Sequence, residues 1–173
     1  MSPKPDLSAE QWFVFHAINN YAPVSLADEI MGLGLDCYVP TKLDNPRLEA
    51  IPGLFFVRCE WRSLAKVRKH LLGKAVEMFE DGEPQVVRDS TIEDMKLLYM
   101  DQTSQPSYLR SIDDILSTSK LVRFTMGPLK GLYGYLKRIH RSRHILYDVD
   151  GIALLSLPGA NYLDCVELIP SQV

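Results

Sequence analysis

The sequence lacks the long apolar segments and the paired cysteines that mark several classes of protein. No run approaches the roughly 18 consecutive apolar residues of a membrane-spanning helix, and residues 1–10 contain no apolar core of a signal peptide. Only three cysteines occur among the 173 residues, at Cys37, Cys59 and Cys165. Because they are widely spaced, they fit neither a disulfide framework nor a zinc site. We expect buried thiols in a reducing cytoplasm, and no membrane association.

The sequence also lacks any recognisable catalytic or cofactor-binding pattern. No G-x-S-x-G, P-loop or dinucleotide-binding glycine pattern occurs. The four histidines are scattered, and His140 and His144 fall in a strand-rich region where a four-residue spacing does not bring two ligands to one helix face. We therefore predict a protein that acts by binding, with no enzymatic activity, no cofactor and no metal site.

Acidic residues are missing from residues 120–144, although the whole chain has a net charge of −3 and a pI of about 5.8. Residues 120–173 contain seven Lys/Arg and four Asp/Glu, whereas residues 1–119 contain twelve and eighteen. This asymmetry suggests two parts with different partners.

The first hundred residues alternate strand patterns with helix patterns. Helices are expected at 23–31, at 64–71 and from Ser90 onward, and the first would carry Val24, Ala27 and Met31 on one face. The expected strands are 12–15, 37–39, 54–57, 75–79 and 85–88. This order predicts a mixed sheet with covering helices in an N-terminal domain of residues 1–101, followed by a linker of residues 102–119.

The remaining residues, 120–173, have no helical periodicity. Asp150-Gly151 between apolar flanks predicts a two-residue hairpin turn. The expected strands are 121–126, 132–140, 144–149, 151–157 and 161–167. Five short strands in so few residues predict a small, strongly bent, SH3-like barrel. The fold class is therefore α+β, with an all-β domain at the C-terminal end.

Three glycines interrupt the first part of this all-β domain. Residues 122–136 read VRFTMGPLKGLYGYL, which resembles the KOW motif through Gly127, Pro128, Gly131 and Gly134. We expect Gly127 and Gly131 in a turn, where glycine adopts conformations that other residues avoid. Gly134 would let the following strand bend. KOW domains are small barrels found in ribosomal proteins and transcription elongation factors.

The N-terminal half resembles the N-terminal domain of the NusG family. The resemblance lies in Trp12-Phe13-Val14, in Tyr38-Val39-Pro40 and in the segment IPGLFFVR of residues 51–58. With the KOW segment, the resemblance covers residues 11–169. The form I-P-x-L-x-F-V-R is most similar to the UpxY-type transcription antiterminators of Bacteroidetes. The segment 41–50 holds only Lys42 and Arg47 as basic residues, whereas relatives often carry a longer, more basic loop there.

The resemblance implies a monomeric cytoplasmic transcription elongation and antitermination factor for long operons of the capsular polysaccharide type. Its N-terminal domain would bind the clamp helices of RNA polymerase in an apolar groove. By position, the groove residues would be Tyr38, Pro40, Ile51, Pro52, Leu54 and Phe56. Strand alternation places Leu54 and Phe56 on one face and Phe55 and Val57 on the other, and either face could be core. The KOW domain would bind a small-subunit ribosomal protein, Rho, nascent RNA or non-template DNA.

A basic cluster in the KOW domain suggests a second contact. Lys137, Arg138, Arg141 and Arg143 would form a positive rim that meets nucleic acid or an acidic partner, although such charges are more commonly a solvated turn. A competing interpretation is a ribosome-associated KOW protein that binds structured RNA. The expected sign of such a protein is strong overall basicity, which this chain lacks.

Overall fold

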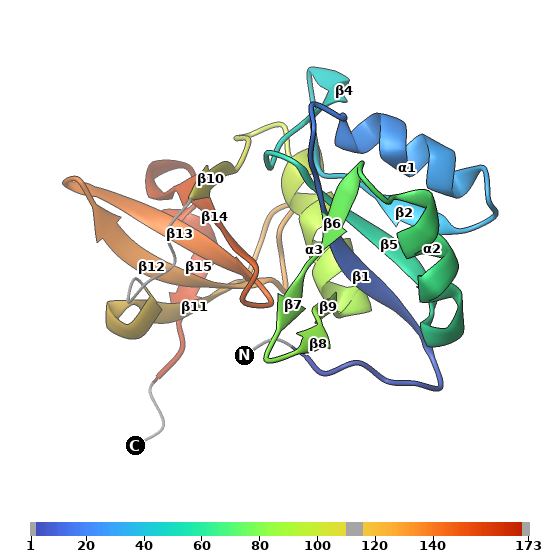
Figure 1. Cartoon of the computed structure of the whole chain (residues 1–173). Helices are drawn as coiled ribbons and strands as arrows, with labels where there is room; N and C mark the ends of the chain where they lie inside the picture. The colour runs from blue at the N-terminus through green and yellow to red at the C-terminus, as the bar shows by residue number, and fades with distance from the viewer. Residues whose placement is uncertain (1–2, 110–115, 171–173) are drawn as a thin grey trace. The chain divides into compact units, whose positions relative to one another are not determined.

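The computed structural model describes residues 3–109 and 116–170. The chain divides into two compact units, residues 1–93 and residues 94–173. Figure 1 shows the elements of each. The predicted boundaries at 101 and 120 stay a prediction. Within the described ranges, no helix is both long enough and apolar enough to cross a membrane.

The first unit is built on one antiparallel sheet. Its strands are β1 (Glu10–Ala17), β2 (Asp36–Tyr38), β5 (Leu54–Glu60), β6 (Ala75–Glu77) and β9 (Val86–Val87). The order is β2-β5-β1-β6, and β9 also pairs with β1. β1 and β2 run in the same direction, but β5 lies between them and pairs antiparallel with each. All pairings of this sheet within the described residues are antiparallel, so it lacks the parallel pairs that a mixed sheet would contain.

Two helices and the odd-numbered face of β1 and β5 form the core of this unit. Phe55 and Val57 of β5 pack there with Phe13 and Phe15 of β1. The helices are α1 (Pro23–Met31) and α2 (Leu64–His70), the latter preceded by the short helix η1 (Trp61–Ser63). The helix expected at 64–71 buries Leu64, Val67 and Leu71. On α1, however, Ile30 is fully buried and Met31 is 46% exposed, because Ile30 lies three residues after Ala27 and continues the face of Val24 and Ala27.

Two small hairpins lie outside the main sheet. They consist of β3 (Thr41–Lys42) with β4 (Asn45–Glu49), and of β7 (Phe79–Glu80) with β8 (Glu83–Pro84). The second hairpin turns at Asp81 and Gly82, which both have positive φ angles. Helix α3 (Asp89–Met100) begins in the first unit and continues into the second, and its Ile92, Met95 and Leu98 are buried.

The second unit is a six-stranded antiparallel sheet. Its order is β10-β14-β13-β12-β11-β15. Its strands are β10 (Ser107–Leu109), β11 (Lys120–Phe124), β12 (Tyr133–Ile139), β13 (Ser142–Val149), β14 (Ala153–Pro158) and β15 (Val166–Leu168). Four of them match the strands expected after residue 120. The turn at Asp150-Gly151 is confirmed, since both residues have positive φ angles and the Ile152 amide donates to the Val149 carbonyl over 2.9 Å.

The C-terminal end of the second unit differs from the sequence expectation. The strand expected at 161–167 is instead the short helices η3 (Gly159–Asn161) and η4 (Leu163–Cys165), followed by the brief β15. Tyr162, which lies between the two helices, is only 3% exposed. Within the segment expected to be a linker, β10 pairs with β14 and η2 (Leu116–Thr118) precedes β11, while residues 110–115 lie outside the described residues.

Candidate functional site

The structure brings together the residues that the sequence assigned to a polymerase-binding groove. Tyr38 and Phe56 are paired across β2 and β5, and their rings stack with centroids 6.2 Å apart. The Ala50 amide donates to the Pro40 carbonyl over 2.7 Å, which holds the segment before β5 beside the end of β2. Ile51, Pro52 and Leu54 follow in the turn that enters β5.

The turn at Pro52 has a geometry that its sequence explains. The Leu54 amide donates to the Ile51 carbonyl over 3.2 Å, and Gly53 has a φ of +74°. Proline followed by glycine is the preferred pair for such a turn. A Cβ on Gly53 would also lie 2.6 Å from Cε1 of His16. The turn is therefore fixed both by its own residues and by close packing on β1.

Most of the predicted groove residues are buried. Phe56 is 0%, Ile51 2% and Leu54 4% exposed, and Pro40 is buried as well. Tyr38 is half-buried, and burial, followed by the nearby Glu93 carboxylate, raises the pKa of its hydroxyl. Pro52 is exposed. Because Phe55 and Val57 pack in the helix-covered core, Leu54 and Phe56 occupy the opposite face, and only Tyr38 and Pro52 of the six present accessible surface.

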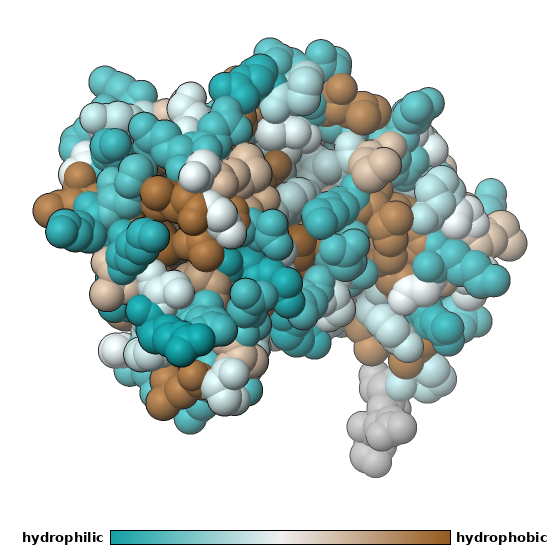
Figure 2. All heavy atoms as spheres, turned by 90° about the vertical axis from the view of Figure 1, so that its right-hand side faces the viewer, coloured by the Kyte–Doolittle hydropathy of each residue, from teal (hydrophilic) through white to brown (hydrophobic). Residues whose placement is uncertain are grey.

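The hairpin β3–β4 carries apolar side chains that the sequence reading missed. Leu43 is 46% and Leu48 41% exposed, and both lie within the segment 41–50. Arg47 of the same hairpin forms an ion pair with Asp28 of α1 over 2.9 Å. Two isolated leucines in so short a hairpin give no periodic signal. Other exposed apolar residues of the first unit are scattered among hydrophilic ones on the face shown in Figure 2.

The four basic residues predicted to form a rim do share one hairpin. Lys137 and Arg138 lie near the end of β12, Arg143 lies near the start of β13, and Arg141 lies in the turn. Arg138 pairs directly with Arg143 across the two strands. Lys137 donates a hydrogen bond from Nζ to the Thr118 hydroxyl. In the described parts of the chain, none of the three arginines lies within ion-pair distance of a carboxylate.

The KOW-like glycines have two different structural roles. Gly127 and Gly131 have φ angles of +81° and +94°, so their conformations favour glycine, as predicted. Gly134 lies inside β12, where a Cβ would be 2.8 Å from Cγ2 of Ile145 and 3.1 Å from the Leu146 carbonyl oxygen. Its absent side chain therefore permits close approach of β13, in addition to any bending of β12.

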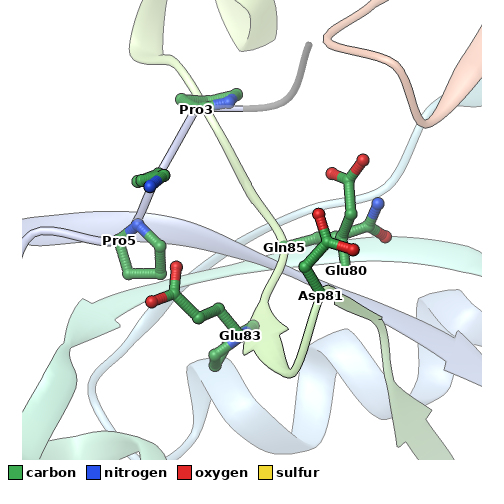
Figure 3. Close-up of a pocket in the computed structure, with 8 residues that line it drawn as sticks. Pro3, Pro5, Glu80, Asp81, Glu83 and Gln85 are labelled. Atoms are coloured by element: carbon green, nitrogen blue, oxygen red, sulfur yellow. The ribbon is translucent and has the colours of Figure 1, made fainter.

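An acidic pocket lies beside the β7–β8 hairpin of the first unit. Its lining includes Pro3, Pro5, Glu80, Asp81 and Glu83, and its volume is about 420 Å³. Figure 3 shows that the Glu83 carboxylate points toward Pro5, whereas Glu80 and Asp81 point elsewhere. Among the described residues, no group of three or more His, Cys, Asp or Glu side chains could hold a metal ion. The negative charge of this pocket would repel nucleic acid.

Comparison with solved structures shows that this chain has a known fold. A solved structure of NusG from Thermotoga maritima is similar to this chain, with a TM-score of 0.52 and 14% sequence identity. The alignment covers 95% of this chain and 100% of that chain. The chain has a NusG-like fold. No family model and no curated protein matches the sequence. The α+β fold class predicted from the sequence is thereby confirmed, and the NusG-like fold accounts for both the helix-covered sheet and the small β unit.

Proposed function

We propose that this chain is a NusG-like transcription elongation and antitermination factor that acts by binding. The observation that carries the proposal is a NusG-like fold over nearly the whole chain, with a KOW-like turn in the predicted place. The I-P-x-L-x-F-V-R segment supports a specialised paralogue of the UpxY type, serving long operons of the capsular polysaccharide type. It would act in the cytoplasm as a monomer, without a cofactor.

The proposed polymerase contact is the surface formed by Tyr38 and Pro52. The clamp helices of RNA polymerase would pack on these two side chains, and affinity would come from apolar burial at a small hot spot. Phe56 supports Tyr38 from the neighbouring strand by ring stacking. In this arrangement Pro40, Ile51, Leu54 and Phe56 shape the contact from within the fold, and the exposed Leu43 and Leu48 could extend it.

Because most of the predicted groove residues are buried, only a substitution at an exposed position can test this contact without unfolding the protein. Phe56→Asp or Leu54→Asp would place a carboxylate where almost no solvent reaches, so we expect these variants to unfold the first unit. Pro52→Asp adds the same charge at an exposed turn position and should leave the fold intact. Leu72→Asp is the matched control, because Leu72 is 82% exposed after α2 and outside the proposed contact.

The second unit would bind a further partner. Candidates are a small-subunit ribosomal protein, Rho, nascent RNA or non-template DNA. The basic β12–β13 hairpin also favours a second candidate function, that of a ribosome-associated protein that binds structured RNA. The net charge of −3 does not favour that function, because RNA-binding ribosomal proteins are expected to be strongly basic overall.

Affinity capture from the native host separates the two functions. The tagged full chain and its Pro52→Asp and Leu72→Asp variants would be used as baits, with captured proteins identified by mass spectrometry. We expect RNA polymerase subunits with the wild type and with Leu72→Asp, and strong depletion with Pro52→Asp. Ribosomal particles without polymerase would support the alternative function instead.

A further inference from the structure

The tip of the β12–β13 hairpin departs from the arrangement that would be most stable. Arg138 and Arg143 are direct cross-strand partners, and like charges in that position are destabilising. The turn between them consists of His140 and Arg141, whose φ angles are +48° and +71°. A turn with two positive φ angles favours Asn-Gly. Both features weaken the hairpin while concentrating positive charge at its tip, which is expected of a binding surface.

A pocket lies directly beside this tip. It has a volume of about 380 Å³, and all of its lining belongs to the second unit. Polar side chains come from β13, and apolar ones come from the last residue of β14 and the segment that follows it. The lining residues are Ser142, Arg143, His144, Pro158, Gly159, Ala160 and Leu163. A mixture of an apolar wall and a polar edge suits a planar heterocycle better than an extended charged chain.

Close packing and a hydrogen bond fix the walls of this pocket. A Cβ on Gly159 would lie 2.5 Å from the Arg143 carbonyl oxygen, so η3 rests directly on the backbone of β13. His144 Nδ1 lies 2.9 Å from Oγ of the buried Ser156. These contacts fix the position of the polar edge relative to the apolar wall. The pocket and the arginines therefore form one surface, shared through Arg143.

We propose that this surface binds single-stranded nucleic acid. One unstacked base occupies the pocket against Pro158, Ala160 and Leu163, and the adjoining phosphates bind Arg138, Arg141 and Arg143. A base within a duplex is stacked and paired, so it cannot enter the pocket without extrusion. Arginine suits the phosphate contacts because its planar, permanently charged group can donate two hydrogen bonds to one phosphate. The proposal identifies the second partner of the proposed function, but its test needs no polymerase.

An acidic protein segment is the competing occupant of a basic hairpin. It would be bound through charge alone and would have no use for a pocket beside Arg143. Ala160 provides the discriminating variant, because it is exposed, uncharged and part of the pocket lining. Ala160→Leu fills the pocket with an aliphatic side chain and leaves every arginine in place. The paired variant is Arg138→Gln/Arg143→Gln, and its matched control is Arg123→Gln/Lys130→Gln, two exposed basic residues elsewhere in the same unit.

Fluorescence anisotropy with the full chain tests the proposal. The probes are a labelled 12-nucleotide single-stranded RNA of mixed sequence, DNA of the same sequence, and the corresponding RNA duplex. We expect the single strands to bind more tightly than the duplex. The arginine pair variant should bind about 25-fold more weakly at about 0.1 M salt, and its salt slope should be shallower by about 1.4, from a slope of about 0.7 per phosphate contact on single strands.

Ala160→Leu should weaken binding about fivefold or more through the lost base contact, with an unchanged salt slope. Comparison of the RNA and DNA probes then shows which polynucleotide is preferred. The proposal is overturned if the duplex binds as well as the single strands, if Ala160→Leu binds normally, or if the arginine pair behaves like its control. Capture of an acidic protein with no oligonucleotide binding would also overturn it. Thermal melting by circular dichroism identifies any variant whose loss of binding comes from unfolding.

Discussion

Tyr162 illustrates how one side chain fixes the path of the chain at the end of the second unit. Its hydroxyl donates a 2.7 Å hydrogen bond to Oδ2 of the buried Asp101, just after α3. Its ring meets that of Phe124 edge-on at 5.8 Å. Burial and the Asp101 carboxylate both raise the pKa of the Tyr162 hydroxyl.

Removal of this hydroxyl should destabilise the protein. Tyr162→Phe preserves the ring contact but leaves the buried Asp101 carboxylate without one of its donors. We expect the free energy of unfolding to fall by about 1–3 kcal/mol. Urea denaturation followed by circular dichroism measures the change. Tyr133→Phe is the control, since Tyr133 is 52% exposed and should change stability by less than about 0.5 kcal/mol. Equal effects of the two substitutions would contradict a structural role for the Tyr162 hydroxyl.

Two cysteines make stability sensitive to alkaline pH. Burial raises the pKa of the Cys37 thiol to about 12 and that of the Cys59 thiol to about 11, from an ordinary value near 9. Above pH 9 the unfolded chain loses these protons while the folded chain retains them, so the free energy of unfolding falls with rising pH. Denaturation series between pH 8 and pH 11 should show a steeper fall for the wild type than for Cys37→Ala/Cys59→Ala. Parallel curves would contradict this assignment.

At the scale of elements, glycine is required in the KOW-like segment for one of two reasons: a positive φ angle, or a lack of room for a side chain. Gly131 has a φ of +94° and open space where a Cβ would lie, whereas Gly134 is in an extended strand with no room for a Cβ. The order in which Ala and Asn are tolerated should therefore be opposite at the two sites. At Gly131, Asn should be tolerated better than Ala because Asn adopts positive φ angles more readily. At Gly134, Ala should be tolerated better than Asn, and even Ala should cost about 1–3 kcal/mol. Melting temperatures of the four variants check both orders, and the same order at both sites would contradict the distinction.

The β12–β13 turn gives a second test at this scale. Replacement of His140-Arg141 by Asn-Gly supplies the residues that a turn with two positive φ angles favours, so we expect stability to rise by about 1 kcal/mol. The same change removes a positive charge, so affinity for single-stranded RNA should fall about fivefold at about 0.1 M salt. Melting and anisotropy measured on one preparation would show both. A more stable variant with undiminished affinity would exclude Arg141 from the binding surface.

Strand periodicity predicted most elements but could not assign their faces. In β5, Leu54 and Phe56 alternate with Phe55 and Val57, yet all four are buried, so the sequence carries no signal for the face that the helices cover. The register of Arg138 with Arg143 depends on a His-Arg turn, which no local rule marks as a hairpin. The pocket beside Arg143 joins residues 142–144 to residues 158–163, and only the tertiary fold brings these segments together.

At the scale of the whole molecule, charge is divided unevenly along the chain, with an acidic excess in residues 1–119 and a basic excess in residues 120–173. The acidic part contains the surface proposed for polymerase, and the basic part contains the hairpin proposed for nucleic acid. Binding to both partners would tether the nucleic acid near the enzyme, and tethering raises the effective concentration of the second contact. The helix-covered sheet and the KOW-like β unit were both anticipated by the sequence, because each has its own periodicity and its own turn residues.

The most direct test of the central claim is the lifetime of a defined pause during transcription by purified host RNA polymerase. Saturating wild-type protein should shorten the pause and increase the fraction of full-length transcript. Leu72→Asp should act like the wild type, and Pro52→Asp should act only at much higher concentration. An unchanged pause lifetime at every concentration of folded wild-type protein, together with no detectable polymerase binding, would contradict the assignment of this chain as an elongation factor.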